Sequence, residues 1–318
     1  PEYSYNSKAA YSELIIPTLD SVRYCYFFHM LVSNKKHVLF VGATGTGKTV
    51  NVMNQLSTAF DDKMVPLCLS FSARTSANLT QDTIDGKCEK RRKGVFGPAA
   101  GKQFCIFVDD MNMPMKEEYG AQPPIEILRQ WFDNGGWFDR KALTFRRIID
   151  CIMVCACGPP GGGRNEVTAR FTRHFNTIAY ADLENHTMEL IFETILENYL
   201  KFGTYDQSVQ VMAIPVVKSV VEIFNNVLAT LRPTPAKCHY SFNLRDISKV
   251  FQGMLMMTKQ KVNNEISMAR MFCHESTRQF ADRFINQQDK DWFQDQIKVM
   301  LKKYMDLEYD VVMEGERL

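Results

Sequence analysis

The segment 42–49 (GATGTGKT) constrains this chain more than any other feature, because it follows directly on the apolar run 37–41 (HVLFV). The spacing G-x-x-x-x-G-K-[ST] between a strand and a helix is typical of a loop whose backbone N–H groups surround phosphates. The glycines permit the curled backbone, and the N-terminus of the following helix adds a positive field. The sequence therefore predicts a phosphate-binding loop in this strand–helix unit.

Two side chains at the end of this loop have predicted roles of their own. Lys48 is expected to reach the β- and γ-phosphates of a nucleotide, and the Thr49 hydroxyl to ligate Mg²⁺. The residues predicted to bind the nucleotide along this segment are Gly42, Ala43, Thr44, Gly45, Thr46, Gly47, Lys48, Thr49 and Val50.

A pair of carboxylates follows the apolar run 104–108 (FCIFV). Asp109 is predicted to hold Mg²⁺, partly through its water shell, as acids at a strand end do in P-loop proteins. Asp110 stands where P-loop ATPases that hydrolyse well usually have Glu, which polarises the attacking water. Its carboxylate stops ~1 Å short of that place, and a displacement of that size costs on the order of 100-fold in rate. We therefore expect nucleotide binding with slow hydrolysis.

Apolar strands and helices alternate through the first 180 residues, which predicts a parallel sheet covered by helices on both faces. The expected strands are 37–41, 65–71, 103–108 and 148–157, and the expected helices are 49–60, 78–93 and 123–134. Later residues are predicted to be helical, over 183–202, 214–231, 244–258, 266–286 and 292–305. We expect a large α/β nucleotide-binding domain at 1–182 and a small helical domain at 183–318.

Composition excludes several classes of protein. Thirty-eight Lys and Arg against thirty-six Asp and Glu give a net charge of +2, so no global basic surface indicates nucleic-acid binding. No apolar run was found that approaches the ~20 residues of a membrane span, so we expect a soluble protein without membrane contact. The nine cysteines are an odd number and no signal peptide precedes them, which favours reduced thiols in a cytosol-like compartment. The chain begins with Pro1 and is expected to be a piece of a longer protein.

Three cysteines, Cys151, Cys155 and Cys157, fall on one face of the strand predicted at 148–157. A metal cluster is the alternative interpretation. Because no His or fourth Cys lies at a zinc-like spacing, we interpret them as buried thiols.

Several longer motifs resemble the third AAA+ module of axonemal dynein heavy chains. They are DDMNMP at 109–114, YGAQPP at 119–124, GPPGGGRN at 158–165, RHFN at 173–176 and YSFNLRD at 240–246. The resemblance covers nearly the whole chain and keeps the order of the motifs. It implies a large P-loop AAA+ domain followed by a small helical lid domain.

The resemblance implies further site residues. Ile16, Pro17 and Thr18 would pack on the adenine, and Asn165 would be the sensor that contacts the γ-phosphate or attacking water. Arg173, with Arg170 as the alternative, would be an arginine finger that serves the neighbouring module's site. Arg245 would contact the nucleotide from the small domain, although its sequence alone predicts an exposed helical pair with Asp246.

The same resemblance implies an ATP- or ADP-binding regulatory module of a dynein ring, in the cytoskeleton of the ciliary axoneme. Its partners would be the adjacent AAA+ modules, with light and intermediate chains and microtubules bound through the rest of the motor. One alternative is a nucleotide-binding structural module that does not hydrolyse ATP. A nucleic-acid-remodelling AAA+ ATPase is the other, disfavoured by the near-neutral charge. A small-molecule kinase would need an acceptor pocket and lid that the sequence does not indicate.

Overall fold

The computed structural model describes residues 5–6 and 9–314, and these divide into two compact units. One unit is Leu19–Asp182, and the other contains Leu183 onward together with the N-terminal segment up to Thr18. The two units join in the chain between Asp182 and Leu183, and the segment up to Thr18 groups with the later residues. The expected domains at 1–182 and 183–318 stay a prediction about functional units.

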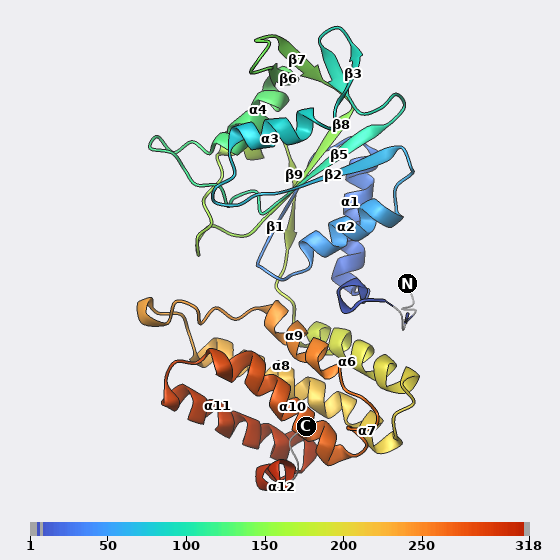
Figure 1. Ribbon diagram of the computed structural model, residues 1–318, viewed down its shortest axis with the longest axis vertical. Coiled ribbons are helices and arrows are strands. Elements are labelled where there is room, and N and C mark those ends of the chain that lie inside the picture. Colours follow the sequence, from blue (N-terminus) through green and yellow to red (C-terminus); the bar gives the residue numbers. More distant parts are fainter. Residues whose placement is uncertain (1–4, 7–8, 315–318) are drawn as a thin grey trace. The chain divides into compact units, whose positions relative to one another are not determined.

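The first unit is built on a five-stranded parallel sheet in the order β2-β5-β8-β1-β9 (Figure 1). The strands are β1 Val38–Gly42, β2 Met64–Ser70, β5 Gln103–Asp109, β8 Cys151–Cys157 and β9 Asn176–Tyr180. This confirms the predicted parallel α/β fold. The edge strand β9 was not predicted, because its polar, half-exposed residues give no continuous apolar run.

Helices cover both faces of this sheet, as expected. Alternate strand residues pack on α1 (Leu19–Ser33) and α2 (Lys48–Thr58) on one face. On the other face the strands pack against α3 (Ala77–Asp85), α4 (Pro123–Asn134) and α5 (Ala169–Thr172). The helix α4 has the bounds that its prolines predict, whereas α1 was not predicted.

A second sheet, in the order β3-β4-β7-β6, corrects two predictions. Its strands are β3 Glu89–Arg92, β4 Val95–Gly97, β6 Gly136–Phe138 and β7 Phe145–Ile148. The predicted helix 78–93 is wrong beyond α3, since Glu89–Arg92 forms β3 and the chain turns back at Gly94, where φ is +72°. The predicted strand 148–157 is interrupted at Asp150, whose φ is +56°, so that β7 and β8 join different sheets.

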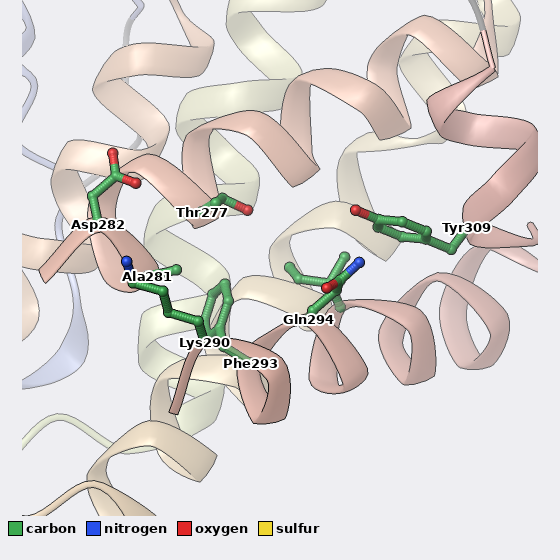
Figure 2. A pocket seen from close by; sticks show the side chains of 8 residues that line it. Thr277, Ala281, Asp282, Lys290, Phe293, Gln294 and Tyr309 are labelled. Atoms are coloured by element: carbon green, nitrogen blue, oxygen red, sulfur yellow. The ribbon is translucent and has the colours of Figure 1, made fainter. Parts of the chain in front are cut away.

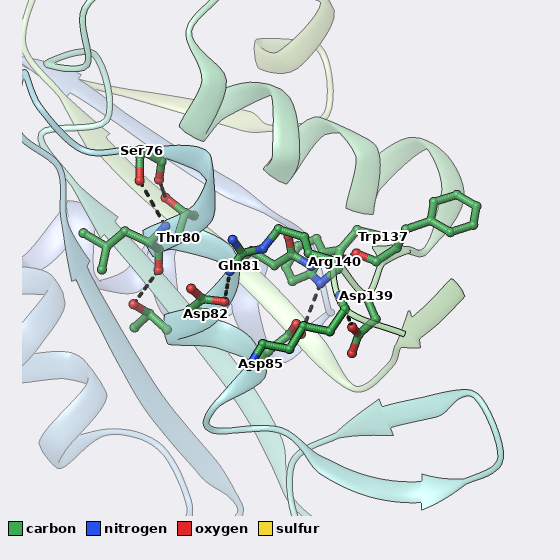
Figure 3. Close-up of polar contacts among 12 residues, drawn as sticks. Ser76, Thr80, Gln81, Asp82, Asp85, Trp137, Asp139 and Arg140 are labelled. Atoms are coloured by element: carbon green, nitrogen blue, oxygen red, sulfur yellow. Dashed lines mark hydrogen bonds and ion pairs between the residues drawn. The ribbon is translucent and has the colours of Figure 1, made fainter. Parts of the chain in front are cut away.

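Polar contacts fasten α3 to the β6–β7 hairpin (Figure 3). Gln81 Nε2 donates to the carbonyl of Phe138 at 2.8 Å, and Trp137 Nε1 donates to Asp85 at 3.1 Å. Both Gln81 and Trp137 are buried. These bonds tie the second sheet to a helix of the first, which gives the hairpin a fixed position on the α/β unit.

The second unit is helical, with a single continuous apolar core. Its helices are α6 Asn185–Phe202, α7 Gln207–Val211, α8 Ala213–Thr230, α9 Leu244–Met254, α10 Glu265–Phe280, α11 Gln287–Met300 and α12 Tyr309–Met313, with a π-helical segment Leu301–Met305 and short 3₁₀ segments Pro235–Lys237 and Ala281–Arg283. The 3₁₀ segment Tyr11–Glu13 precedes them in the chain. Several predicted helices end earlier than expected, as α9 does at Met254.

One stretch of this unit is long and apolar enough to resemble a membrane span, contrary to the expectation that no apolar run approaches that length. Gln207–Thr230 has 24 residues and contains an 18-residue window with a mean hydropathy of 1.5. In the structure 56% of its apolar window is buried, and α8 supplies residues such as Val216 and Val220 to the helical core. A core helix of this kind meets the same criterion by length and composition.

The N-terminal segment belongs to the helical unit through specific contacts. Ile16 is buried in the core of that unit, and Tyr11 packs against the same core. Ser248 Oγ in α9 also donates a hydrogen bond to the Tyr11 hydroxyl at 3.1 Å. Long-range apolar packing of this kind decides to which unit a short segment belongs.

Candidate nucleotide site

The loop between β1 and α2 has the backbone that phosphate binding requires. Gly45 and Gly47 have φ values of +89° and +85°, and Gly47 is the N-cap of α2. A left-handed N-cap of this kind needs glycine, and it leaves the first N–H groups of α2 unpaired by the helix itself. The residue pattern of the loop has thus produced the predicted strand–loop–helix geometry.

Lys48 lies across this loop instead of extending into solvent. Its Nζ donates to the carbonyls of Gly42 at 2.8 Å and Ala43 at 2.6 Å, and to Thr46 Oγ1 at 3.3 Å. Burial lowers the pKa of Lys48, while the nearby Asp109 carboxylate raises it. The loop is therefore closed around a cation whose present partners are carbonyl and hydroxyl oxygens, and which a phosphate would bind more strongly.

The sheet brings Thr49 and Asp109 together although sixty residues separate them. Thr49 Oγ1 donates to Asp109 Oδ2 at 2.7 Å. A hydroxyl and a carboxylate are oxygen donors of the type that Mg²⁺ binds. Both predicted metal-binding residues are thus in one place, and their chemistry fits a magnesium ion.

Asp110 has an unusual backbone at the end of β5. Its φ is +49°, its N–H donates to Asp109 Oδ1 at 2.9 Å, and the N–H of the following Met111 donates to Ala156 of β8 at 3.0 Å. Asp110 Oδ1 lies 3.7 Å from Arg164 Nη2, an ion pair that is close to the loop. The second carboxylate is therefore paired with an arginine.

Asn112 of the DDMNMP motif fastens the end of β8 to this region, a role that sequence reasoning did not assign. Its Nδ2 donates to the carbonyl of Gly158 at 2.7 Å. The backbone carbonyl of Asn112 accepts from the N–H of Asn165 at 2.9 Å. The side chain is 2% exposed, and Oδ1 is buried without a hydrogen-bond partner. The signal that could have found it is its position three residues after Asp109.

Asn165, the residue that the resemblance implies as a sensor, is close to the same segment. Its Nδ2 donates to the carbonyl of Pro114 at 2.8 Å. This hydrogen bond and the backbone bond to Asn112 hold Asn165 against the chain that follows β5. The amide donors of Asn165 are thus partly used within the protein.

Arg173 and Arg170, the two candidate fingers, lie at the end and in the middle of α5. Arg173 Nη2 is 3.2 Å from Asp133 of α4, and its side chain is 62% exposed. Arg170 is also exposed. Arg173 therefore forms an ion pair at the surface, while keeping the exposure that contact with another molecule needs.

The remaining predicted site residues belong to the helical unit. Ile16 and Thr18 are buried there, and Pro17 is partly buried between them. Arg245 lies in the first turn of α9, as expected, and is exposed. The predicted exposed pair with Asp246 is wrong, because Asp246 is buried and bound by Arg283 at 3.0 Å.

The three strand cysteines share one face of β8, as predicted, and contribute to a single apolar cluster. Burial raises the pKa of the Cys157 thiol to about 11, against the opposing effect of Lys48 and Arg164. All nine cysteines are free thiols. Over the described ranges 5–6 and 9–314, no group of three or more His, Cys, Asp or Glu side chains is placed to hold a metal ion.

A separate cavity of about 240 Å³ lies in the helical unit (Figure 2). Its lining comes from α10, the 3₁₀ segment Ala281–Arg283, α11 and the start of α12. Lys290 and Asp282 lie at one end and Tyr309 at the other. No residue predicted for the nucleotide site lines this cavity.

A phosphate-binding loop after β1 and a carboxylate pair after β5 of a parallel sheet define a P-loop nucleotide-binding protein. Residues 3–183 match the family described as the P-loop containing dynein motor region, and residues 216–314 match the AAA+ lid domain. The chain belongs to the dynein motor region family, and this family implies nucleotide binding.

Several relatives are axonemal dynein heavy chains. Dynein axonemal heavy chain 1 of Mus musculus is 45% identical over 305 residues, which are 92% of this chain and 7% of the relative. Dynein axonemal heavy chain 12 of Mus musculus is 44% identical over 308 residues, which are 96% of this chain and 10% of that relative. Dynein axonemal heavy chain 6 of Homo sapiens is 43% identical over 314 residues, which are 97% of this chain and 8% of that relative. The chain thus spans a tenth or less of the length of these relatives.

Proposed function

We propose that this chain is a slowly hydrolysing, regulatory ATP-binding module of an axonemal dynein motor, at the third position of its AAA+ ring. The observation that carries the proposal is the pairing of Thr49 with Asp109 at 2.7 Å next to the buried Lys48. This pairing brings a phosphate-binding cation and two oxygen donors suited to Mg²⁺ together at one edge of the sheet, at the ends of β1 and β5. The assignment to the third position rests on the DDMNMP and GPPGGGRN motifs.

Binding would begin at the loop. The N–H groups at the start of α2 and the Lys48 ammonium would take the phosphate oxygens, and Lys48 would exchange its carbonyl partners for them. Thr49 and Asp109 would hold Mg²⁺, which when bound neutralises charge on the phosphates. We assign contact with the adenine to Ile16, Pro17 and Thr18, contact from the small domain to Arg245, and polar contact near the γ-phosphate to Asn165. The nucleotide-binding domain as a functional unit would thus be 1–182, with 183–318 as its lid.

Slow turnover follows from Asp110. Its side chain is one methylene shorter than Glu, so its carboxylate stops ~1 Å short of the place from which Glu polarises the attacking water. A module that holds ATP or ADP for a long time is suited to regulation, because its nucleotide state can set the conformation of the ring. The exposed Arg173, or Arg170, would serve the site of the neighbouring module.

The partners and location follow from the same assignment. We propose the adjacent AAA+ modules of the heavy chain as direct partners, and light and intermediate chains and microtubules as partners through the rest of the motor. The place of action would be the ciliary axoneme. No nucleic acid or membrane partner is included in the proposal.

Calorimetric titration of the 318-residue chain with ATP and ADP, each with Mg²⁺, tests nucleotide binding. We expect both nucleotides to bind, and Lys48→Ala to abolish measurable binding of both. Lys63→Ala, which removes an exposed lysine before β2, is the matched control and should bind as the unchanged chain does. Absence of binding to the unchanged chain would contradict the proposal.

A module that binds nucleotide without hydrolysing it is a second candidate, favoured by Asp110 in the place of the usual Glu. Single-turnover hydrolysis in a motor that contains the neighbouring modules distinguishes the two. Phosphate release that is lost when Asp110 or Asn165 is substituted supports the hydrolysing module. No release attributable to this site in the unchanged motor supports the second candidate.

A further inference from the structure

The end of β8 lies between the two halves of the nucleotide site. In the sheet, β8 is hydrogen-bonded to β1 on one side and to β5 on the other. Its last residue, Cys157, is in register with Val41, so Gly158 follows beside the start of the phosphate loop. Glycine at position 158 places no side chain at this point of the sheet edge.

Arg164 occupies the space that glycine leaves. A β-carbon built on Gly158 would lie 2.7 Å from Arg164 Nε and 2.8 Å from its Cδ, closer than real contacts allow. The turn that returns Arg164 to this place is closed by two backbone hydrogen bonds between Gly161 and Arg164, at 3.0 and 3.1 Å. The guanidinium is therefore held against the backbone at the end of β8.

The surroundings of Arg164 are those of an anion site. Its Nη2 is 3.7 Å from Asp110, and its charge acts on both Lys48 and Cys157. Its Nε is buried and has no hydrogen-bond partner. Within the described part of the chain, only Asn112 Oδ1 and Ser276 Oγ share that property. A buried donor without a partner costs free energy, so a ligand that accepts from it gains binding.

Two cations, Lys48 and Arg164, thus face the same small region, with Asp110 as the only acid that contacts Arg164 in the described structure. Asn165, in contrast, directs its amide to the Pro114 carbonyl. We infer that Arg164 binds the terminal phosphate of ATP together with Lys48, and that glycine at position 158 makes room for it. The inference rests on the proposed function, because it names the group that distinguishes ATP from ADP at that site.

Arg164 also links the terminal phosphate to the carboxylate. With a phosphate present, the guanidinium has a doubly charged partner with which it forms paired hydrogen bonds, and its hold on Asp110 is weakened. Asp110 would then be released only when ATP is bound. Arg164 is therefore a phosphate-binding residue and, through Asp110, a positioning residue.

Titration of the 318-residue chain with ATPγS and with ADP, both in Mg²⁺, tests the inference. Arg164→Gln is expected to weaken ATPγS binding about 10-fold or more and to leave ADP binding within about twofold, since ADP lacks the terminal phosphate. Gly158→Ala should give the same selective loss, because the new methyl group displaces the guanidinium. Arg147→Gln, which makes the same charge change at an exposed position of β7, should alter neither affinity.

The outcomes separate this inference from the proposed function. The role of Arg164 would be overturned if Arg164→Gln and Gly158→Ala lowered the affinities for ATPγS and ADP equally, or lowered neither. Nucleotide binding by the unchanged chain would still stand in that case. Failure of the unchanged chain to bind either nucleotide would overturn the proposed function and the inference with it. If Arg164→Gln does not fold, as judged by circular dichroism, Gly158→Ala tests the role of Arg164 through the ratio of its affinities for ATPγS and ADP.

Discussion

Thr49 Oγ1 and Asp109 Oδ2 lie 2.7 Å apart, so the end of the phosphate loop and the end of β5 meet in one hydrogen bond. Asp109 is the last residue of β5, and Thr49 lies in α2 after the loop that follows β1. The strands β1 and β5 are not neighbours in the sheet, since β8 lies between them. The contact therefore reaches across the end of β8, after which Gly158 and Arg164 follow in the chain. Any ion that replaces this hydrogen bond will bind both elements at once.

Thr49→Val keeps the shape of the side chain and removes its hydroxyl. We expect it to weaken ATP binding in the presence of Mg²⁺ by roughly 10-fold or more, the effect of losing a hydrogen bond or ligand to a charged group. In excess EDTA the affinity should stay close to that of the unchanged chain. Titration calorimetry under both conditions measures the difference.

The matched control is Thr58→Val at the other end of α2, where the hydroxyl donates only to the Asn54 carbonyl. This variant should bind Mg·ATP normally. An equal loss for Thr49→Val with and without Mg²⁺ would show that the hydroxyl acts on the fold of the loop rather than on the ion.

Asp110→Glu extends the second carboxylate by one methylene. In a motor that contains the neighbouring modules, we expect the single-turnover hydrolysis rate of this site to rise on the order of 10- to 100-fold, because the carboxylate moves ~1 Å toward the attacking water. Lys48→Ala in the same motor supplies the background from the other modules. A rate no higher than that of the unchanged motor would exclude side-chain length as the reason for slow turnover.

His37 is expected to make stability depend on pH. Its Nδ1 accepts a hydrogen bond from the Met153 N–H at 3.0 Å, and burial followed by repulsion from His174 lowers its pKa to about 4. In the unfolded chain His37 takes up a proton near pH 6.5. The contribution of neutral His37 to the free energy of unfolding is therefore complete above that pH and is lost as the pH falls toward 4. The free energy of unfolding should decrease by up to about 3 kcal/mol over this range.

Urea unfolding at several pH values measures this effect. His37→Asn supplies an acceptor oxygen near the same place and does not titrate, so it should flatten the decrease between about pH 6.5 and 4. His186→Asn replaces an exposed histidine of the helical unit and should leave the profile unchanged. Identical profiles for His37→Asn and the unchanged chain would refute the assignment.

Gln81→Ala tests the fastening of α3 to the hairpin. It leaves the Phe138 carbonyl without its 2.8 Å partner, and we expect a loss of about 1–3 kcal/mol in the free energy of unfolding. Asn78→Ala removes an exposed amide one turn earlier on the same helix and should change stability by less than about 0.5 kcal/mol. Denaturant unfolding that gives the same value for both variants would show that the bond contributes no net stability.

The phosphate loop, the carboxylate pair and the parallel sheet could be predicted because the signals for them lie in short continuous stretches of the sequence. The run 37–49 contains a strand, a glycine loop and a helix start in order, and the structure places β1 at Val38–Gly42 and α2 from Lys48. The helix α4 was predicted at its observed bounds because Pro123 and Pro124 mark its first turn. Local backbone preference and apolar pattern suffice for such elements.

Where contacts between distant segments decide the outcome, the sequence was insufficient. The basic run at Glu89–Arg92 has a helical composition, yet it pairs as β3 with β4, which in turn pairs with β7 some fifty residues later. The N-terminal segment lies beside the α/β unit in the sequence but buries Ile16 in the helical core. In each case tertiary packing overrides local preference.

The chemistry of the site divides in the same way. The sequence by itself determined which residues can bind a phosphate and Mg²⁺, because a lysine, a hydroxyl and a carboxylate have those properties wherever they lie. Only the tertiary structure decided that β8 lies between β1 and β5, so that Gly158 opens a space there and Arg164 fills it beside Asp110. The reason is physical: strand order depends on contacts between segments far apart in the chain, and no local pattern encodes it.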